Sequence, residues 1–166
     1  MDKRVLSVHE RFKNLQRLKK PLYFSAATIV NSCKEAMEAQ GNTQLTPMDY
    51  LECLLNIKDN FRKINQVKDE GFVYVLSAVM SMVPVEVIAK LHDIILEYIT
   101  DVLKKNTNTI VIKYSVVVIQ FLLESKTQEQ WKDDDSTLEQ FIKLFNLCLN
   151  TKEIINRQAI RSFMII

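Results

Sequence analysis

The sequence predicts an all-α protein of seven to eight helices. Only two glycines and three prolines occur among its 166 residues, whereas hairpins use such residues at each chain reversal. Between Pro84 and Lys105, apolar residues recur every three or four positions, as in an amphipathic surface helix. The residues of this stripe are Val87, Ile88, Leu91, Ile94, Ile95, Tyr98, Ile99, Val102 and Leu103. Two nearly continuous apolar runs flank it, Phe72 to Val83 and Ile110 to Leu123.

The first part of the chain is predicted to be a basic arm followed by two helices. Residues 1–20 carry an apolar stripe of their own and are expected to form an amphipathic helix. A second helix is predicted from Leu22 to Gln40, because Gly41 is a typical helix end. Thr46 and Pro47 mark the next start, since threonine caps a helix and proline suits its first position. We expect this third helix to bury Tyr50, Leu51, Leu54 and Leu55, with Ile57 as a further candidate.

The middle of the chain contains the apolar helix and the amphipathic one. Lys58 to Glu70 is charged and poorly periodic, so we expect a loop or a weak helix there. Gly71 to Met82 is predicted to be a helix that ends before Pro84, because the residue before a proline is disfavoured in helical conformation. One continuous amphipathic helix then extends through Lys105, and Asn106 to Thr109 is predicted to be a polar turn.

The last third begins with an ambiguous segment. Ile110 to Leu123 is rich in β-branched residues, and propensity alone permits a buried strand. We predict a helix, because no turn chemistry or pairing partner lies nearby. After a polar stretch from Glu124 to Ser136, Ser136 is expected to cap a helix. Its buried face comprises Leu138, Phe141, Ile142, Phe145, Cys148 and Leu149. A final helix is expected after Thr151.

The order of these helices suggests a solenoid. Amphipathic and nearly all-apolar helices alternate at roughly one pair per 40 residues, which is typical of HEAT or armadillo repeats. Under this hypothesis residues 1–166 are a single helical-repeat segment, with the arm at 1–20 and stacked helices at 22–166. The last helix runs into an apolar end, so we expect the chain to be a fragment of a longer solenoid. The alternative is a compact irregular bundle.

Basic residues are the main candidates for binding. The net charge of the chain is +2, but its positive charges concentrate in the arm and the final helix. These candidate contacts to RNA or an acidic partner are Lys3, Arg4, Arg11, Lys13, Arg17, Lys19, Lys20, Lys152, Arg157 and Arg161. A solvated helix face explains the arm equally well.

Catalytic and metal-binding patterns are absent from the sequence. Two isolated glycines build no phosphate loop. His9 and His92 lack a ligand partner at helical spacing, and His92 is expected at the surface or its boundary. Asp133 to Asp135 lack the alternating spacing of a calcium loop and are interpreted as a solvated turn. We therefore expect no cofactor and no enzymatic activity.

Trp131 is the single tryptophan, and two interpretations remain open for it. Flanked by charges, it is expected to clamp a loop onto a helix pair. Exposed, it would be a hot spot for a partner. The clamp is the favoured interpretation.

The cysteines and the apolar runs indicate the environment of the chain. Cys33, Cys53 and Cys148 are odd in number and widely spaced, so they are expected to be reduced and buried rather than disulfide-bonded. The longest apolar run, Ile110 to Leu123, has 14 residues and is interrupted by Lys113 and Gln120. A membrane-spanning helix needs roughly 20, so no membrane partner is expected.

The order of several segments resembles a known family. They are CKEAMEAQG, MDYLECLLNI, FVYVLSAVMSMVPVEVI, VVVIQFLLESKTQEQW and LEQFIKLFNLCLNTKEIINRQA, between about Leu22 and the C-terminus. This arrangement is similar to the N-terminal repeat region of the ribosomal RNA-processing protein 12 family, HEAT-repeat factors of small-subunit ribosome assembly. The chain departs from the family at the start of its last helix, where Ile154 and Asn156 replace a denser basic cluster.

The resemblance implies a function and a location. It implies a non-enzymatic scaffold in pre-rRNA processing and in maturation or export of the small-subunit precursor. The partners would be pre-ribosomal particle proteins, pre-ribosomal RNA or both, in the nucleolus and nucleus with shuttling to the cytoplasm. The alternative is a helical-repeat adaptor, or a module like a transport receptor, that binds proteins without RNA contact.

Overall fold

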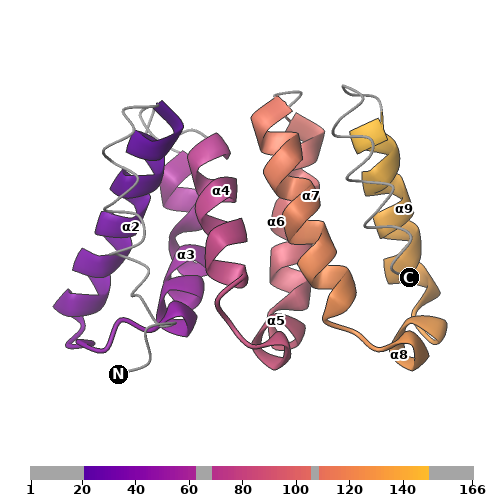
Figure 1. Cartoon of the computed structure of the whole chain (residues 1–166), viewed down its shortest axis with the longest axis horizontal. Coiled ribbons are helices and arrows are strands. Elements are labelled where there is room, and N and C mark those ends of the chain that lie inside the picture. The colour runs from indigo at the N-terminus through magenta and orange to yellow at the C-terminus, as the bar shows by residue number, and fades with distance from the viewer. Residues whose placement is uncertain (1–20, 63–68, 106–108, 150–166) are drawn as a thin grey trace. The chain divides into compact units, whose positions relative to one another are not determined.

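A computed structural model describes residues 21–62, 69–105 and 109–149, and this part of the chain contains eight helices and no strand (Figure 1). The all-α prediction is therefore confirmed for the described residues. The chain divides into two compact units at the predicted break between Val83 and Pro84. Each unit is described by itself.

The first unit contains three helices that pack pairwise on one another: α2 (Pro21–Ala39), α3 (Pro47–Arg62) and α4 (Asp69–Met80). Successive helices run in opposite directions (Figure 1). Their shared core includes Ala26, Ile29, Val30, Cys33, Tyr50, Leu51, Leu54, Val73, Leu76 and Val79. The predicted buried face of the third helix is confirmed at its four main positions, and the further candidate Ile57 is half-buried.

The predicted signals at the end of α2 and the start of α3 operate as expected. Gly41 has a φ of +85°, and the N–H of Asn42 donates to the carbonyl of Met37 at 2.9 Å. The N–H of Asp49 donates to Thr46 Oγ1 at 3.2 Å, and the N–H of Thr46 donates to Asp49 Oδ2 at 2.8 Å. This reciprocal pair satisfies two donors that a helix start leaves unpaired.

The charged segment from Lys58 to Glu70, predicted to be a loop or a weak helix, is helical at both of its described ends. Residues Lys58 to Arg62 continue α3, and Asp69 and Glu70 begin α4. Two acidic residues in a first helical turn are favourable, because they interact with the positive end of the helix dipole. Poor apolar periodicity therefore did not prevent helix formation here.

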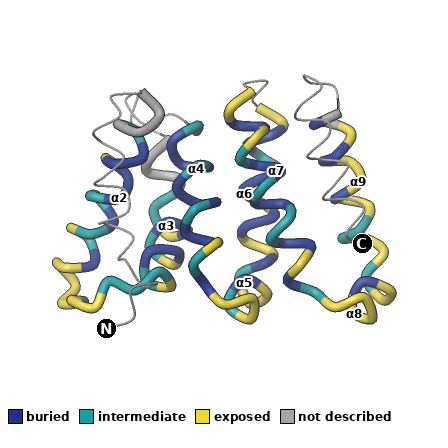
Figure 2. The backbone as a smooth tube through the Cα atoms, in the orientation of Figure 1, coloured by how far each residue is buried: buried dark blue, intermediate teal, exposed yellow. Residues whose placement is uncertain are grey.

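The second unit contains α5 (Val85–Lys90), α6 (His92–Lys105), α7 (Thr109–Glu124), α8 (Gln128–Lys132) and α9 (Asp135–Leu149). The long helices α6, α7 and α9 pack on one another, and α5 and α8 are short helices at their ends (Figure 1). Most of α5 and α8 is exposed or half-buried, whereas buried positions recur along α7 (Figure 2). The helix prediction for Ile110 to Leu123 is confirmed.

The amphipathic stretch after Pro84 was predicted to be one helix, and the structure has two. The break falls at Leu91, whose φ and ψ of −100° and 8° leave the α-helical region. Periodicity misses such a break, because the N–H groups of Leu91 and Ile95 still find carbonyls one turn back, on Val87 and Leu91. The apolar stripe continues across it, with Ile88 and Ile95 both buried.

Three further details of the second unit correct the predictions. The cap of α9 is Asp134 rather than Ser136, since Asp134 Oδ1 accepts the N–H of Thr137 at 3.3 Å. Ile94 and Ile142, both expected inside, are 45% and 41% exposed. Leu138 is half-buried, and the core position of α9 that the prediction missed is Leu144.

Candidate functional site

The ten predicted basic contact residues lie outside the described part of the chain. They fall in residues 1–20 and 150–166, as do the predicted arm helix and final helix. The site predictions that the structure does place are Trp131, His92, the aspartate triplet and the cysteines. All except Cys33 and Cys53 belong to the second unit.

Trp131 joins α8 to the end of α7. Its side chain is 5% exposed, and its indole N–H donates to the carbonyl of Leu123 at 3.0 Å. A buried indole that finds a hydrogen-bond partner contributes both apolar burial and orientation. This arrangement matches the clamp interpretation, and it corrects the alternative of an exposed hot spot.

An aromatic cluster surrounds the indole. The ring centroids of Trp131 and Phe141 are 5.4 Å apart, and that of His92 lies 6.2 Å from Trp131 and 6.0 Å from Phe141. All three pairs are edge-to-face, an arrangement favoured by the charge distribution of aromatic rings. Because these rings come from α8, α9 and α6, the cluster ties three helices together.

His92 is 3% exposed, so its predicted place at the surface or boundary is wrong. The sequence did hold a signal for its burial: His92 precedes Ile95 and Leu96 by three and four residues, which puts it on the same helix face. The prediction placed His92 at the surface because histidine is polar, and it gave less weight to this spacing. The aromatic neighbours that accept the ring come from helices distant in sequence.

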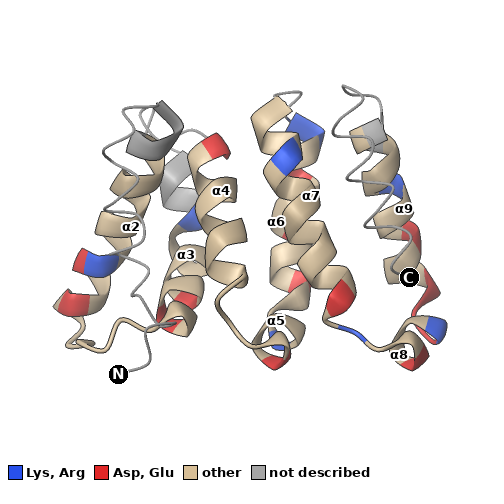
Figure 3. Ribbon diagram, in the orientation of Figure 1, with Lys and Arg blue, Asp and Glu red and all other residues tan. Residues whose placement is uncertain are grey.

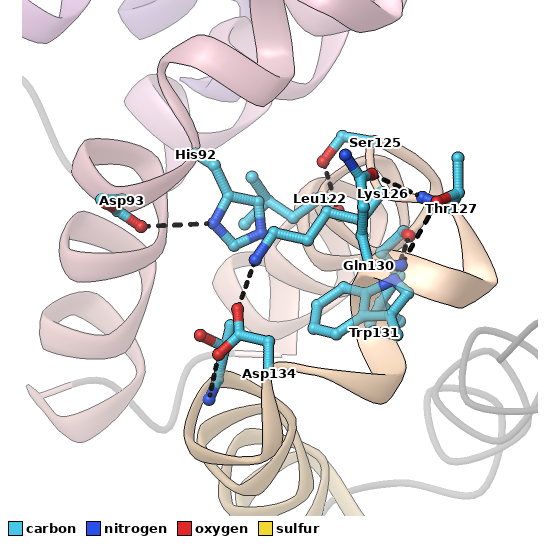
Figure 4. Close-up of polar contacts among 11 residues, drawn as sticks. His92, Asp93, Leu122, Ser125, Lys126, Thr127, Gln130, Trp131 and Asp134 are labelled. Atoms are coloured by element: carbon cyan, nitrogen blue, oxygen red, sulfur yellow. Dashed lines mark hydrogen bonds and ion pairs between the residues drawn. The ribbon is translucent and has the colours of Figure 1, made fainter.

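Lys126 and Asp134 place a charge pair beside the cluster (Figure 4). Lys126 Nζ lies 2.6 Å from Asp134 Oδ2 and 4.8 Å from the centroid of the Trp131 ring. Hydrogen bonds from Lys126 and then Thr137 lower the pKa of Asp134 to about 2. The loop before α9 is thereby held by one ion pair, one cation–π contact and one helix cap.

The aspartate triplet is otherwise a solvated turn. Asp133 and Asp135 are exposed, and only Asp134 is half-buried. No group of three or more histidine, cysteine or acidic side chains within the described ranges is arranged to hold a metal ion.

A capping box at the start of α8 was missed by the sequence analysis. The N–H of Gln130 donates to Thr127 Oγ1 at 3.3 Å, and the N–H of Thr127 donates to Gln130 Oε1 at 2.9 Å. The spacing Thr-x-x-Gln is a recognisable start signal. It was available in the sequence, and it fixes the short helix that carries Trp131.

His92 is held in its neutral form. Burial lowers its pKa from the ordinary 6.5, and the nearby Lys126 lowers it further, while Asp93 and Asp134 oppose this shift in part. Neither ring nitrogen has a hydrogen-bond partner within the described residues, and Asp93 Oδ1 lies 3.6 Å from Nδ1. The imidazole, edge-to-face with the rings of Trp131 and Phe141, acts here as a packing group.

The stability of the chain is expected to fall as the pH drops below about 6.5. Below pH 6.5 His92 binds a proton in the unfolded chain, whereas in the folded chain its lowered pKa keeps it neutral. The contribution of His92 to stability is therefore fully present above pH 6.5 and decreases below it. Because a single proton is involved, the free energy of unfolding should change by at most about 1.4 kcal/mol per pH unit. Urea unfolding between pH 7.5 and 5 measures it. His92→Leu should remove this dependence, and an unchanged slope in that variant would contradict the assignment.

Asp134→Ala is expected to cost about 1–2 kcal/mol, because it removes a half-exposed ion pair and a helix cap. Asp134→Asn keeps an oxygen for the N–H of Thr137 and should cost about half as much. Urea denaturation followed by circular dichroism measures both. Asp133→Ala, at an exposed neighbour, serves as the control with little effect. Equal losses for the alanine and asparagine variants would show that the cap contributes nothing.

Exposed apolar side chains are the other surface feature of the described residues. The large ones are Met48, Val85, Ile94, Ile110 and Ile142, each 37–50% exposed. Single exposed apolar residues are ordinary on soluble domains. Ile94 and Ile142 lie beside the buried residues Ile95 and Phe141 on α6 and α9, and their own side chains are exposed.

None of the described helices combines the length and apolar character that crossing a bilayer requires. Comparison of the chain with protein-family models, curated proteins and solved structures finds no match.

Proposed function

We propose that this chain is a non-enzymatic scaffold in the assembly of the small ribosomal subunit. In this proposal it is a HEAT-like solenoid segment that binds assembly proteins, pre-ribosomal RNA or both, in the nucleolus and nucleus. The resemblance of its segment order to the ribosomal RNA-processing protein 12 family is one support. A second support is the all-helical fold of the described residues. Within the first unit α2, α3 and α4 run antiparallel in succession, as in repeat scaffolds.

The separation of charge along the chain carries the proposal. The described residues contain 10 lysines and arginines against 17 aspartates and glutamates, so their helices are acidic (Figure 3). The remaining residues contain 12 basic against 3 acidic side chains. Phosphate is attracted by positive and repelled by negative charge. Any RNA contact is therefore assigned to the basic segments, chiefly residues 1–20.

RNA binding is expected to weaken steeply with salt. For the 7 basic residues of the arm, affinity for a structured precursor-RNA fragment should fall on the order of a thousandfold between about 50 and about 200 mM salt. Filter binding or fluorescence anisotropy measures this. Reversal of the seven arm charges to glutamate should abolish binding.

A matched control reverses exposed positive charges of the described helices instead. Lys90, Lys104 and Lys105 are exposed in α5 and α6, and their reversal should change the affinity little. A salt-independent affinity, or binding that survives reversal of the arm, would show that the arm does not contact RNA.

A protein adaptor without RNA contact is the second candidate. It is favoured by the acidic described helices, which attract a basic protein surface, and by exposed Ile94 and Ile142. A pull-down from cell extract with and without nuclease separates the two. Partners lost after nuclease treatment support RNA-mediated assembly, whereas partners that persist support the adaptor. Ile94→Asp should release the persistent partners if the apolar contacts matter.

A further inference from the structure

Two cysteines meet between α2 and α3 in the first unit. Cys53 Sγ lies 3.9 Å from the backbone carbonyl oxygen of Cys33, and the two thiols are hydrogen-bonded to each other. The two helices pack directly against one another (Figure 1). The helix pairing thus brings the side chain of Cys53 against Cys33, 20 positions earlier in the sequence.

The two thiols have different environments. Cys33 is fully buried, whereas Cys53 is half-buried and so partly accessible to solvent. The hydrogen bond from the Cys33 thiol lowers the pKa of Cys53 to about 7, and the same contact together with burial raises the pKa of Cys33. A thiolate is the reactive form of cysteine. Cys53 is therefore the accessible nucleophile, and Cys33 is a protonated thiol behind it.

A buried hydroxyl accompanies the pair. Tyr50 lies three residues before Cys53 on α3, and its hydroxyl is buried without a hydrogen-bond partner among the described residues. Burial raises the pKa of Tyr50 to about 12, and the two thiols and Glu38 add to this increase. The O–H therefore stays protonated at neutral pH. An unpaired buried donor is costly and calls for an explanation.

We propose that Cys53 is a reversible oxidation site for hydrogen peroxide, and that Cys33 resolves it by forming a disulfide between α2 and α3. In the first step the Cys53 thiolate attacks one peroxide oxygen, the O–O bond breaks, and hydroxide leaves, giving a sulfenic acid. In the second step Cys33 sulfur attacks Cys53 sulfur. The S–O bond breaks, and the departing hydroxide takes the Cys33 proton as water.

The two steps balance. Two thiols are oxidised by two electrons in total, and one peroxide is reduced to two waters. A dithiol reductant reverses the reaction by thiol–disulfide exchange. Cys148 offers an internal comparison, because it is fully buried and burial raises its pKa to about 11. It should remain a thiol under conditions that oxidise Cys53.

The test is peroxide treatment of the full chain, followed by alkylation of free thiols and peptide mapping. The wild-type chain should lose two hydrogen atoms and yield a single Cys33–Cys53 cross-linked peptide, with Cys148 alkylated. The reaction should accelerate as the pH rises, because the lowered pKa of Cys53 makes its thiolate the form that gains population first. Dithiothreitol should restore both thiols.

Two variants assign the roles. Cys33→Ser should stop at the sulfenic acid, which dimedone captures at Cys53. Cys53→Ser should leave Cys33 unoxidised, and Cys148→Ser should behave as the wild-type chain does. These assays use folded protein, verified by circular dichroism.

The wild-type mapping needs no variant and decides the proposal by itself. A Cys53 sulfenic acid that persists in the wild-type chain, or cross-links that involve Cys148 equally, would overturn the pairing. Oxidation of Cys33 in Cys53→Ser at the wild-type rate would overturn the assignment of Cys53 as the attacking thiolate.

Discussion

Trp131→Ala is expected to lower the free energy of unfolding by about 3–5 kcal/mol, the usual cost of removing a large buried aromatic side chain. The change leaves a cavity beside Phe141 and His92, removes the hydrogen bond to the carbonyl of Leu123, and leaves Lys126 without its aromatic contact. Denaturation with urea, followed by circular dichroism, measures the loss. Tryptophan fluorescence is unsuitable for this comparison because Trp131 is the only tryptophan.

Two other variants separate the contributions at this position. Trp131→Phe keeps an aromatic ring but loses the N–H donor and part of the volume, so it should cost less than the alanine variant. Ile94→Ala, at a side chain that is 45% exposed, should change the stability by no more than about 0.5 kcal/mol. If Trp131→Ala were as stable as Ile94→Ala, the indole would not contribute to holding α8 against the other helices.

Gly71→Ala is expected to destabilise the first unit by about 1–3 kcal/mol, although alanine favours helix more than glycine does. A Cβ at Gly71 would lie 2.5 Å from Cβ of Ser25 and 3.2 Å from the carbonyl carbon of that residue. The glycine therefore allows α4 to approach α2 closely. Thermal or urea unfolding of the variant measures the loss.

A second-site change tests the cause. Ser25→Gly removes the atom that the new Cβ would meet, so the double variant should recover part of the loss. Gly41→Ala is the matched control: its Cβ would meet nothing within 4 Å, but its φ of +85° strains any L-residue. That variant should cost about 1 kcal/mol, and Ser25→Gly should not rescue it. If the changes in unfolding free energy caused by Gly71→Ala and Ser25→Gly simply added in the double variant, the steric explanation would be refuted.

The local signals predicted most of the described helices. Thr46 with Pro47 and Gly41 mark helix ends through their own backbone chemistry, which needs no distant partner. The apolar run from Ile110 to Leu123 was correctly predicted to be helix. The prediction failed at Leu91, because an apolar stripe reports which residues face inward and does not report whether the helix axis continues.

The candidate site was predicted less completely than the fold. The clamp interpretation of Trp131 matches its burial, but its partners were not foreseen. His92 was placed at the surface, since no local feature reveals the rings of Trp131 and Phe141 around it. The sequence likewise treated Cys33 and Cys53 as separate buried thiols, whereas the pairing of α2 with α3 puts them in contact.

The sequence by itself determined the helical class of the described residues, most helix boundaries and the separation of basic from acidic segments. These properties depend on backbone propensity, capping and periodicity over a few neighbouring residues. Only the tertiary structure decided that Lys126 pairs with Asp134 beside Trp131, that Gly71 touches Ser25, and that two cysteines meet. Such contacts join residues on different elements, and their distances follow from how helices pack.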